Sequence, residues 1–99
     1  MTIGRFTLEP AARRLSFEGR PLDLTATEYD LLECLVRAAG QIVSRDKLMA
    51  TVFGREATPI DRSLDVHVSH LRRKLGAERE LILTVRGVGY MCRLEANVR

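Results

Sequence analysis

The chain has little that would support a metal centre or insertion into a membrane. Its 99 residues contain only two cysteines, Cys34 and Cys92, whose spacing matches no metal-binding or redox motif. We interpret both as small core residues in a reducing compartment. No run of 18 apolar residues is present, which argues against a membrane span. Residues 1–8 lack the apolar segment of a signal peptide, so we expect a cytoplasmic protein.

The usual signatures of catalysis are also missing. The sequence has no nucleophile–base pair, no paired carboxylates and no glycine-rich phosphate loop before a helix, so we expect neither an enzyme nor a cofactor. His67 and His70 are three residues apart in a predicted helix and could share a metal ion. No further ligand follows at a zinc-like spacing, and we therefore predict no metal site.

Charge is distributed unevenly along the chain. Residues 1–44 carry five arginines and six acidic residues, whereas residues 45–99 carry eleven lysines and arginines and seven acidic residues. An excess of positive charge in the second half favours a polyanionic partner. Most charged segments, however, only form a solvated surface. The length is sufficient for one small core, so we expect residues 1–99 to form a single domain.

Short strands are predicted before the first helix. Alternating apolar and polar residues indicate strands at Ile3–Leu8, Arg14–Phe17 and Leu22–Leu24, with a turn at residues 18–20. An antiparallel meander is the simplest arrangement of three such strands.

Two helices follow the predicted meander. Thr25–Glu28 is a capping box that predicts the start of the first helix, and Gly40 suits its C-terminal end. Ser44 is expected to cap the second helix, which Gly54 ends. The apolar residues that we expect these helices to bury are Tyr29, Leu32, Leu35, Val36 and Ala39 in the first, and Leu48, Met49, Val52 and Phe53 in the second.

The third predicted helix has two different faces. Thr58 is its expected cap, Pro59 suits its first turn, and Gly76 follows its end. One stripe at helical spacing is apolar and consists of Ile60, Leu64, Val68, Leu71 and Leu75. At about 100° per residue, the opposite face carries Arg62, Val66, Ser69 and Arg73, with His70 at its edge. A helix anchored by one face and cationic on the other is suited to the major groove of DNA.

A β-hairpin is predicted after the third helix. Leu81–Val85 and Tyr90–Leu94 are extended runs joined by a tight turn that contains Arg86 and two glycines. The element order is therefore strands, three helices and a hairpin.

Four segments resemble, in order and spacing, the motifs of the OmpR/PhoB-type effector domain of bacterial two-component response regulators. These are Leu24–Leu32, Gly40–Leu48, Asp61–Leu75 and Thr84–Tyr90. The resemblance covers nearly the whole chain. It implies an α+β winged helix-turn-helix with an N-terminal antiparallel meander, three helices and a C-terminal hairpin wing. It also implies sequence-specific binding to double-stranded DNA, at direct repeats in promoters, by a transcriptional regulator.

Within this family, the short loop Gly54–Arg62 and the following helix are most similar to the CpxR branch. Many members carry tryptophan at the end of the second helix, where this chain has Phe53 and Gly54. The family also has a phosphorylatable receiver domain, which is absent here, so we expect a fragment. A cognate sensor kinase would act only through that domain.

The resemblance also assigns roles to individual residues. The positions that match the family's major-groove helix are Arg62, Ser63, Val66, His67, Ser69, His70 and Arg73. We expect contacts with the DNA backbone from Arg45, Lys47, Arg72, Lys74, Thr84 and Tyr90. A cation at a hairpin tip can enter a narrow minor groove, and we assign Arg86 to that role.

Structural alternatives stay open for several of these residues. His67 lies near the apolar stripe and could instead pack against the first helix. The cations Arg72–Lys74 could serve only to balance the helix dipole, and Arg86 could be an ordinary exposed turn residue. Asp65 is an acid among cations, for which we expect an ion pair with Arg45 or Arg86.

The loop between the second and third helices has a second possible role. In similar proteins this loop can touch RNA polymerase, and here it carries Arg55, Glu56 and Thr58. A plain connector is equally consistent with the sequence. A winged helix used for protein contact is the alternative function for the whole domain. Its third helix would present an apolar or acidic face, whereas Arg62, Ser69 and Arg73 favour DNA.

Overall fold

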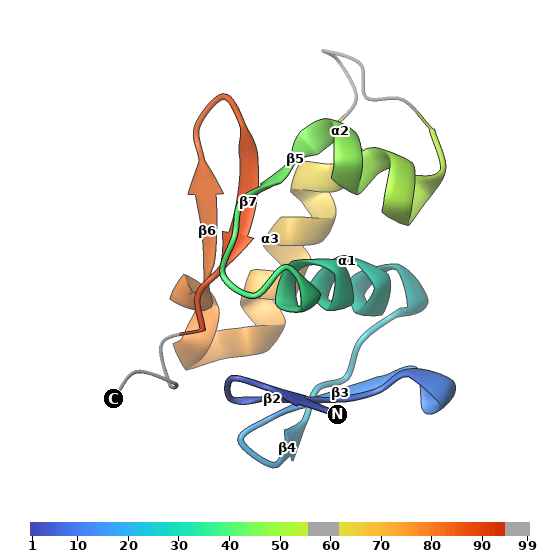
Figure 1. Cartoon of the computed structure of the whole chain (residues 1–99), viewed down its shortest axis with the longest axis vertical. Coiled ribbons are helices and arrows are strands. Elements are labelled where there is room, and N and C mark those ends of the chain that lie inside the picture. Colours follow the sequence, from blue (N-terminus) through green and yellow to red (C-terminus); the bar gives the residue numbers. More distant parts are fainter. Residues whose placement is uncertain (56–61, 95–99) are drawn as a thin grey trace.

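A computed structural model describes residues 1–55 and 62–94, which form two small sheets and three α-helices (Figure 1). Figure 1 shows the N-terminal sheet on one side of α1 and α2 on the other, with the hairpin β6–β7 beside them. This order confirms the predicted α+β architecture. The elements are β1 (Thr2–Ile3), β2 (Phe6–Glu9), the 3-10 turn η1 (Pro10–Ala12), β3 (Arg14–Phe17), β4 (Arg20–Pro21), α1 (Ala26–Arg37), β5 (Val43–Ser44), α2 (Arg45–Leu48), the π-helical turn η2 (Met49–Phe53), α3 (Ser63–Leu75), the 3-10 segment η3 (Gly76–Leu81), β6 (Ile82–Val85) and β7 (Gly89–Cys92).

The N-terminal sheet is an antiparallel meander with the strand order β1-β2-β3-β4. The single strand predicted at Ile3–Leu8 is wrong, because the chain turns at Gly4 and Ile3 pairs with Phe6. Gly4 has φ +61°, a conformation that is easy only for glycine. The strand predicted at Arg14–Phe17 is confirmed. The alternating residues Phe6, Leu8, Leu15 and Phe17 are buried.

The last strand of this sheet begins earlier than predicted. Glu18 and Gly19 both have positive φ, 50° and 81°, and Phe17 pairs with Arg20 across them. Two such residues form the tight turn whose twist suits a hairpin. The fourth strand is therefore Arg20–Pro21 rather than Leu22–Leu24. The two leucines instead lie partly buried against the core.

Helix α1 begins at the predicted capping box. The Glu28 amide donates to the Thr25 hydroxyl over 3.2 Å, and the Thr25 amide donates to the Glu28 carboxylate over 2.9 Å. The helix ends at Arg37, before the position expected from Gly40. Ala39 is exposed and left-handed, with φ 54°, so its assignment to the buried stripe is wrong. The other four predicted stripe residues are buried.

Helix α2 also follows its sequence signals. The Ser44 hydroxyl accepts a hydrogen bond of 3.1 Å from the Lys47 amide and caps the first turn. The helix continues through η2 and ends at Gly54, which has φ +70°. Leu48 and Met49 are fully buried.

Helix α3 is anchored by the predicted apolar stripe. Leu64, Val68, Leu71 and Leu75 are each at most 1% exposed. The helix begins at Ser63 because Arg62 is not helical, with φ −103° and ψ 7°. The described helix thus begins later than predicted, and Thr58, Pro59 and Ile60 lie outside the described residues. Gly76 ends the helix as predicted.

The C-terminal hairpin joins β5 in a sheet with the order β5-β7-β6. Gly89 is the residue that permits this pairing. A Cβ atom at Gly89 would overlap the Val43 carbonyl and lie 2.8 Å from the Ser44 Cα. Glycine is therefore required where β5 pairs with β7.

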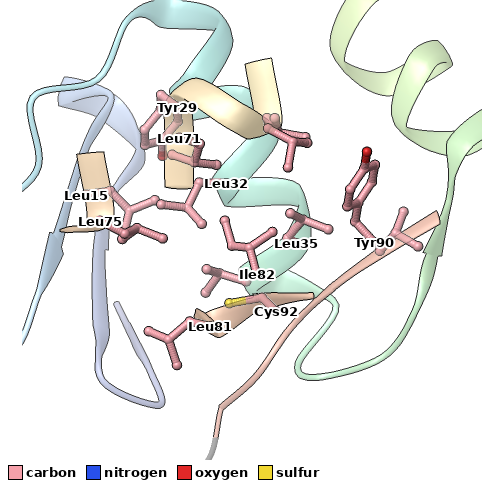
Figure 2. Packing of buried hydrophobic residues seen from close by; sticks show 14 of the residues in the cluster. Leu15, Tyr29, Leu32, Leu35, Leu71, Leu75, Leu81, Ile82, Tyr90 and Cys92 are labelled. Carbon is pink, nitrogen blue, oxygen red and sulfur yellow. The ribbon is translucent and has the colours of Figure 1, made fainter. Parts of the chain in front are cut away.

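The core unites both sheets with the helices. Figure 2 shows aliphatic side chains of α1 and α3 meeting between the N-terminal sheet and the hairpin. Cys92 is buried there and Cys34 is half-buried, and both are free thiols. Within the described residues, no helix has the length and apolar character needed to cross a membrane.

Candidate nucleic-acid interface

The face of α3 opposite its buried stripe is open to solvent. Val66 is 46% exposed, and Ser69 and Arg73 are also exposed. His70 is half-buried at the edge of this face. The face therefore presents a cation, a hydroxyl and a branched apolar group along one side of a rigid helix. This is the division of faces that the sequence predicted.

The start of α3 differs from the prediction. Arg62 is exposed but occupies the position before the first helical residue, so it belongs to the end of the helix rather than to its face. The Ser63 hydroxyl accepts a 2.8 Å hydrogen bond from Arg55 Nη2. The Arg55 guanidinium also lies 5.3 Å from the Phe53 ring centroid, so this loop residue is held against both helices. The other two candidate polymerase contacts, Glu56 and Thr58, lie outside the described residues.

His67 is a packed residue at the boundary of α3. Its Nδ1 lies 2.8 Å from the Ser63 carbonyl oxygen, which can only accept, so we assign the proton to Nδ1. The ring centroid lies 5.4 Å from that of Phe53 and 6.3 Å from that of His70. The ring therefore packs on Phe53 of η2, at the end of α2.

An acidic residue of α3 connects two other elements. Asp65 Oδ1 accepts from Arg45 Nη1 over 2.7 Å and from the Tyr90 hydroxyl over 2.5 Å. The predicted ion pair of Asp65 is thus formed with Arg45 of α2. Burial and the bond to Asp65 raise the pKa of Tyr90 to about 12. The Tyr90 hydroxyl, for which the sequence predicts a phosphate contact, donates to Asp65 in this structure.

Arg72 and Lys74, in the last turn of α3, have partners inside the protein. Arg72 donates through Nε and Nη2 to the Ile82 carbonyl, over 3.0 and 2.8 Å, and through Nη2 to the Thr84 hydroxyl over 2.7 Å. Lys74 Nζ donates over 2.7 Å to the Glu28 carboxylate, whose side chain is only 4% exposed. These contacts fix α3 to β6 and to the start of α1.

The hairpin places a cation at its tip. Arg86 is exposed there, next to Gly87 with φ +77°. Val88, on the same turn, is 48% exposed. A groove of about 180 Å³ separates the hairpin from α2 and α3 and is lined by residues including Arg45, Asp65, Thr84 and Arg86. The depression is therefore formed by the hairpin, Arg45 of α2 and Asp65 of α3.

Two of these contacts are absent from the sequence-based prediction. The bond between Tyr90 and Asp65 and the ion pair between Lys74 and Glu28 each join residues far apart in the chain. The capping box identified Glu28 as a polar group at a helix start, but no spacing rule connects it to Lys74. In the part of the chain that the structure describes, no three histidine, cysteine or acidic side chains cluster as metal ligands would.

Comparison with known proteins agrees with this geometry. Residues 19–92 match the family model described as "Transcriptional regulatory protein, C terminal". The transcriptional regulatory protein CpxR of Escherichia coli K12 is 40% identical over 94 residues, which are 92% of this chain and 40% of CpxR. The response regulator PmrA of Pseudomonas aeruginosa is 39% identical over 87 residues, which are 88% of this chain and 38% of PmrA. The chain thus spans about 40% of the length of these relatives.

Solved structures show the same similarity. The DNA-binding domain of E. coli CpxR matches with a TM-score of 0.82 and 40% identity, over 93% of both chains. The DNA-binding domain of Klebsiella pneumoniae RstA, solved in complex with the RstA box, matches with a TM-score of 0.81 and 36% identity, over 93% of this chain and 94% of that one. The matched family is one of transcriptional regulatory proteins and is not a class of enzymes. The chain belongs to the OmpR/PhoB-type family of winged-helix DNA-binding domains of response regulators.

Proposed function

We propose that this domain binds double-stranded DNA sequence-specifically, with α3 in the major groove and the hairpin β6–β7 as a wing in the minor groove. The observation that carries the proposal is the division of α3 into two faces. One is at most 1% exposed at four apolar positions, and the other presents Val66, Ser69 and Arg73 to solvent. The similar RstA domain, solved with its RstA box, supports the same partner.

Base reading belongs to the exposed side of α3. Arg73 carries a guanidinium that can donate two parallel bonds to guanine O6 and N7, and Val66 can touch a thymine methyl group. Ser69 and His70 offer hydrogen-bonding groups beside them. Arg62 lies at the helix end and would reach the groove from there. Ser63 and His67 face contacts within the protein, so we propose that they support the helix terminus more than they read bases.

Phosphate contacts would flank the helix on both sides. Lys47 is exposed in the first turn of α2, and Arg45 lies beside it. Lys74 has three N–H donors, of which Glu28 takes one, and Arg72 uses Nε and Nη2 within the protein. We propose that both contribute through their remaining donors. Thr84 and Tyr90 would act chiefly by holding Arg72 and Asp65.

The wing would place Arg86 in the minor groove. An exposed guanidinium on a narrow hairpin tip fits a groove whose negative potential is greatest at A·T-rich sequence. Arg86 lines one groove together with Asp65 of α3, which suits a protein whose hairpin and third helix contact adjacent grooves of the same duplex.

A selection experiment tests this function. The chain is equilibrated with a pool of random duplexes, and the bound DNA is enriched and sequenced. We expect a recurring motif, with log K falling against log salt at a slope of about −5 to −6 for five to seven neutralised phosphates. No enrichment, or affinity independent of salt, would contradict the proposal and favour a protein partner for α3.

Wider roles follow from the family and remain proposals. The relatives are more than twice as long as this chain, so we propose that phosphorylation and pairing with a sensor kinase belong to a receiver domain outside these residues. Binding at direct repeats in promoters and contact with RNA polymerase through the loop after α2 are proposed on the same basis. Action on bacterial promoters would place the protein in the cytoplasm.

A further inference from the structure

Asp65 occupies a position where a carboxylate is electrostatically unfavourable for a DNA-binding surface. It lies in the first turn of α3, and its side chain remains 38% exposed beside the groove between α3 and the hairpin. Phosphates approaching this groove would be repelled by it, because like charges disfavour contact. A neutral or basic residue would give greater affinity for any duplex. A carboxylate at this position therefore has to contribute something other than attraction to DNA.

The hydrogen bonds of Asp65 show what it contributes to the structure. A single oxygen, Oδ1, accepts from Arg45 of α2 and from Tyr90 of β7, so one atom joins three elements. Hydrogen bonds to a carboxylate are short and strong because the acceptor is charged. Asp65 Oδ1 therefore fixes the positions of α2 and β7 relative to α3.

Neighbouring contacts extend the same arrangement to the hairpin. The Arg45 amide donates over 3.0 Å to the carbonyl of Val88 in the hairpin turn. The Arg72 guanidinium lies 5.8 Å from the Tyr90 ring centroid and bonds to Ile82 and Thr84 of β6. The turn of the hairpin is therefore bound to α2, and both of its strands are bound to α3.

We infer that Asp65 is a positioning residue for DNA recognition, which fixes the hairpin and the start of α2 relative to α3 through the hydroxyl of Tyr90 and the guanidinium of Arg45. This inference rests on the proposed function and adds a determinant of specificity to it. Tight but unspecific binding needs only positive charge, whereas recognition needs two groove-reading elements at a set separation. Asp65 thus lowers the affinity for DNA of any sequence and raises the specificity for the recognised sequence.

A simpler role for Asp65 would be to balance the dipole at the start of α3. Two variants separate the roles. Asp65→Asn removes the charge and disrupts the pair with Arg45. Tyr90→Phe removes only the hydroxyl and leaves the dipole, the charge and Arg45 in place. Asp46→Asn is the matched control, since Asp46 is an exposed acid in the first turn of α2.

The test measures dissociation constants for a duplex that the wild-type chain selects from a random pool and for a scrambled duplex of equal composition. The ratio of the two constants is the specificity. For Asp65→Asn we expect unchanged or tighter binding to the scrambled duplex and a specificity about fivefold to tenfold lower. Tyr90→Phe should lower specificity about threefold or more with unaltered salt dependence. In the double variant the losses should not add, because one oxygen mediates both.

The control variant should tighten binding to both duplexes alike and keep the specificity within about twofold. Equal behaviour of Asp65→Asn and Asp46→Asn would overturn the positioning role while leaving DNA binding intact. Full specificity in Tyr90→Phe would also overturn it, and this variant remains informative if Asp65→Asn fails to fold. If the wild type selects no duplex, the proposed function and this inference fail together.

Discussion

The ion pair between Lys74 and Glu28 makes a quantitative prediction about stability. Replacing Lys74 by methionine preserves most of the apolar stem but removes the ammonium group that lies 2.7 Å from a carboxylate with 4% exposure. Breaking a fully buried pair costs about 3–5 kcal/mol, and an exposed pair contributes about 0–1 kcal/mol. Lys74 is itself 34% exposed, so water can replace part of its contact. We therefore expect a loss of about 1–2 kcal/mol at neutral pH.

The pH dependence of stability should change as well. Burial raises the pKa of Glu28, but hydrogen bonds from Lys74 and Thr25 outweigh it and hold that pKa below its ordinary value. A carboxyl whose pKa is lowered by folding stabilises the protein above its unfolded pKa, and the contribution is lost as pH falls through the folded value. In Lys74→Met, burial still raises the pKa of Glu28, and only the hydrogen bonds with Thr25 lower it. The variant should therefore lose less stability than the wild type on acidification.

Urea unfolding monitored by circular dichroism, at neutral pH and at about pH 4, checks both expectations. A loss of 1 kcal/mol corresponds to a fall in melting temperature of about 4–8 °C for a domain of this size. Lys47→Met is the control, because Lys47 is exposed on α2. If both lysine variants unfold at the same urea concentration, the pair contributes nothing and the reasoning is refuted.

Four further predictions concern the hairpin and α3. Gly89→Ala should lower the free energy of unfolding by about 3 kcal/mol or more, because its Cβ would overlap the Val43 carbonyl and force β5 away. A smaller loss in urea unfolding would show that β5 moves freely. Folding raises the pKa of Tyr90 to about 12, so the neutral hydroxyl contributes fully to the free energy of unfolding below the unfolded pKa of about 10. This contribution should be lost between about pH 10 and 12, which ultraviolet titration of tyrosinate can follow against Tyr90→Phe. Arg86→Ala should weaken binding most at sites with A·T-rich flanks, and Arg73→Ala should cost about 1–3 kcal/mol at one base pair; equal losses at every sequence would assign either residue to the backbone.

Local signals in the sequence were sufficient for most of the fold. The capping box at Thr25 and the apolar spacing in α3 act within a few residues, and both are confirmed. The errors occurred where backbone conformation decided the outcome. Alternation over residues 3–8 is compatible with one strand or with a hairpin, and only the left-handed Gly4 distinguishes them. Likewise, Ala39 takes the conformation that glycine favours, one residue before Gly40.

The candidate site was predictable to the extent that one helix face defines it. The exposed positions Val66, Ser69 and Arg73 follow from helical geometry alone. The partner of a long side chain does not, because it depends on how distant segments pack. The bond from Tyr90 to Asp65, for example, joins two residues that are 25 positions apart and follows from no local spacing rule.

The left-handed backbone at non-glycine residues has a practical consequence for this domain. Within residues 1–55 and 62–94, the positions with positive φ that are not glycine are Arg13, Glu18 and Ala39, and none belongs to α2, α3 or the hairpin. Such a conformation costs on the order of 1–2 kcal/mol, only part of which glycine would return through its more flexible unfolded chain. Glu18 and Arg13 also form ion pairs with Arg5 and Asp30, which a substitution by glycine would remove. Ala39 is therefore the position at which glycine would recover stability, and it lies outside α2, α3 and the hairpin. The stability of the domain can thus be raised without changing the proposed DNA-binding surface.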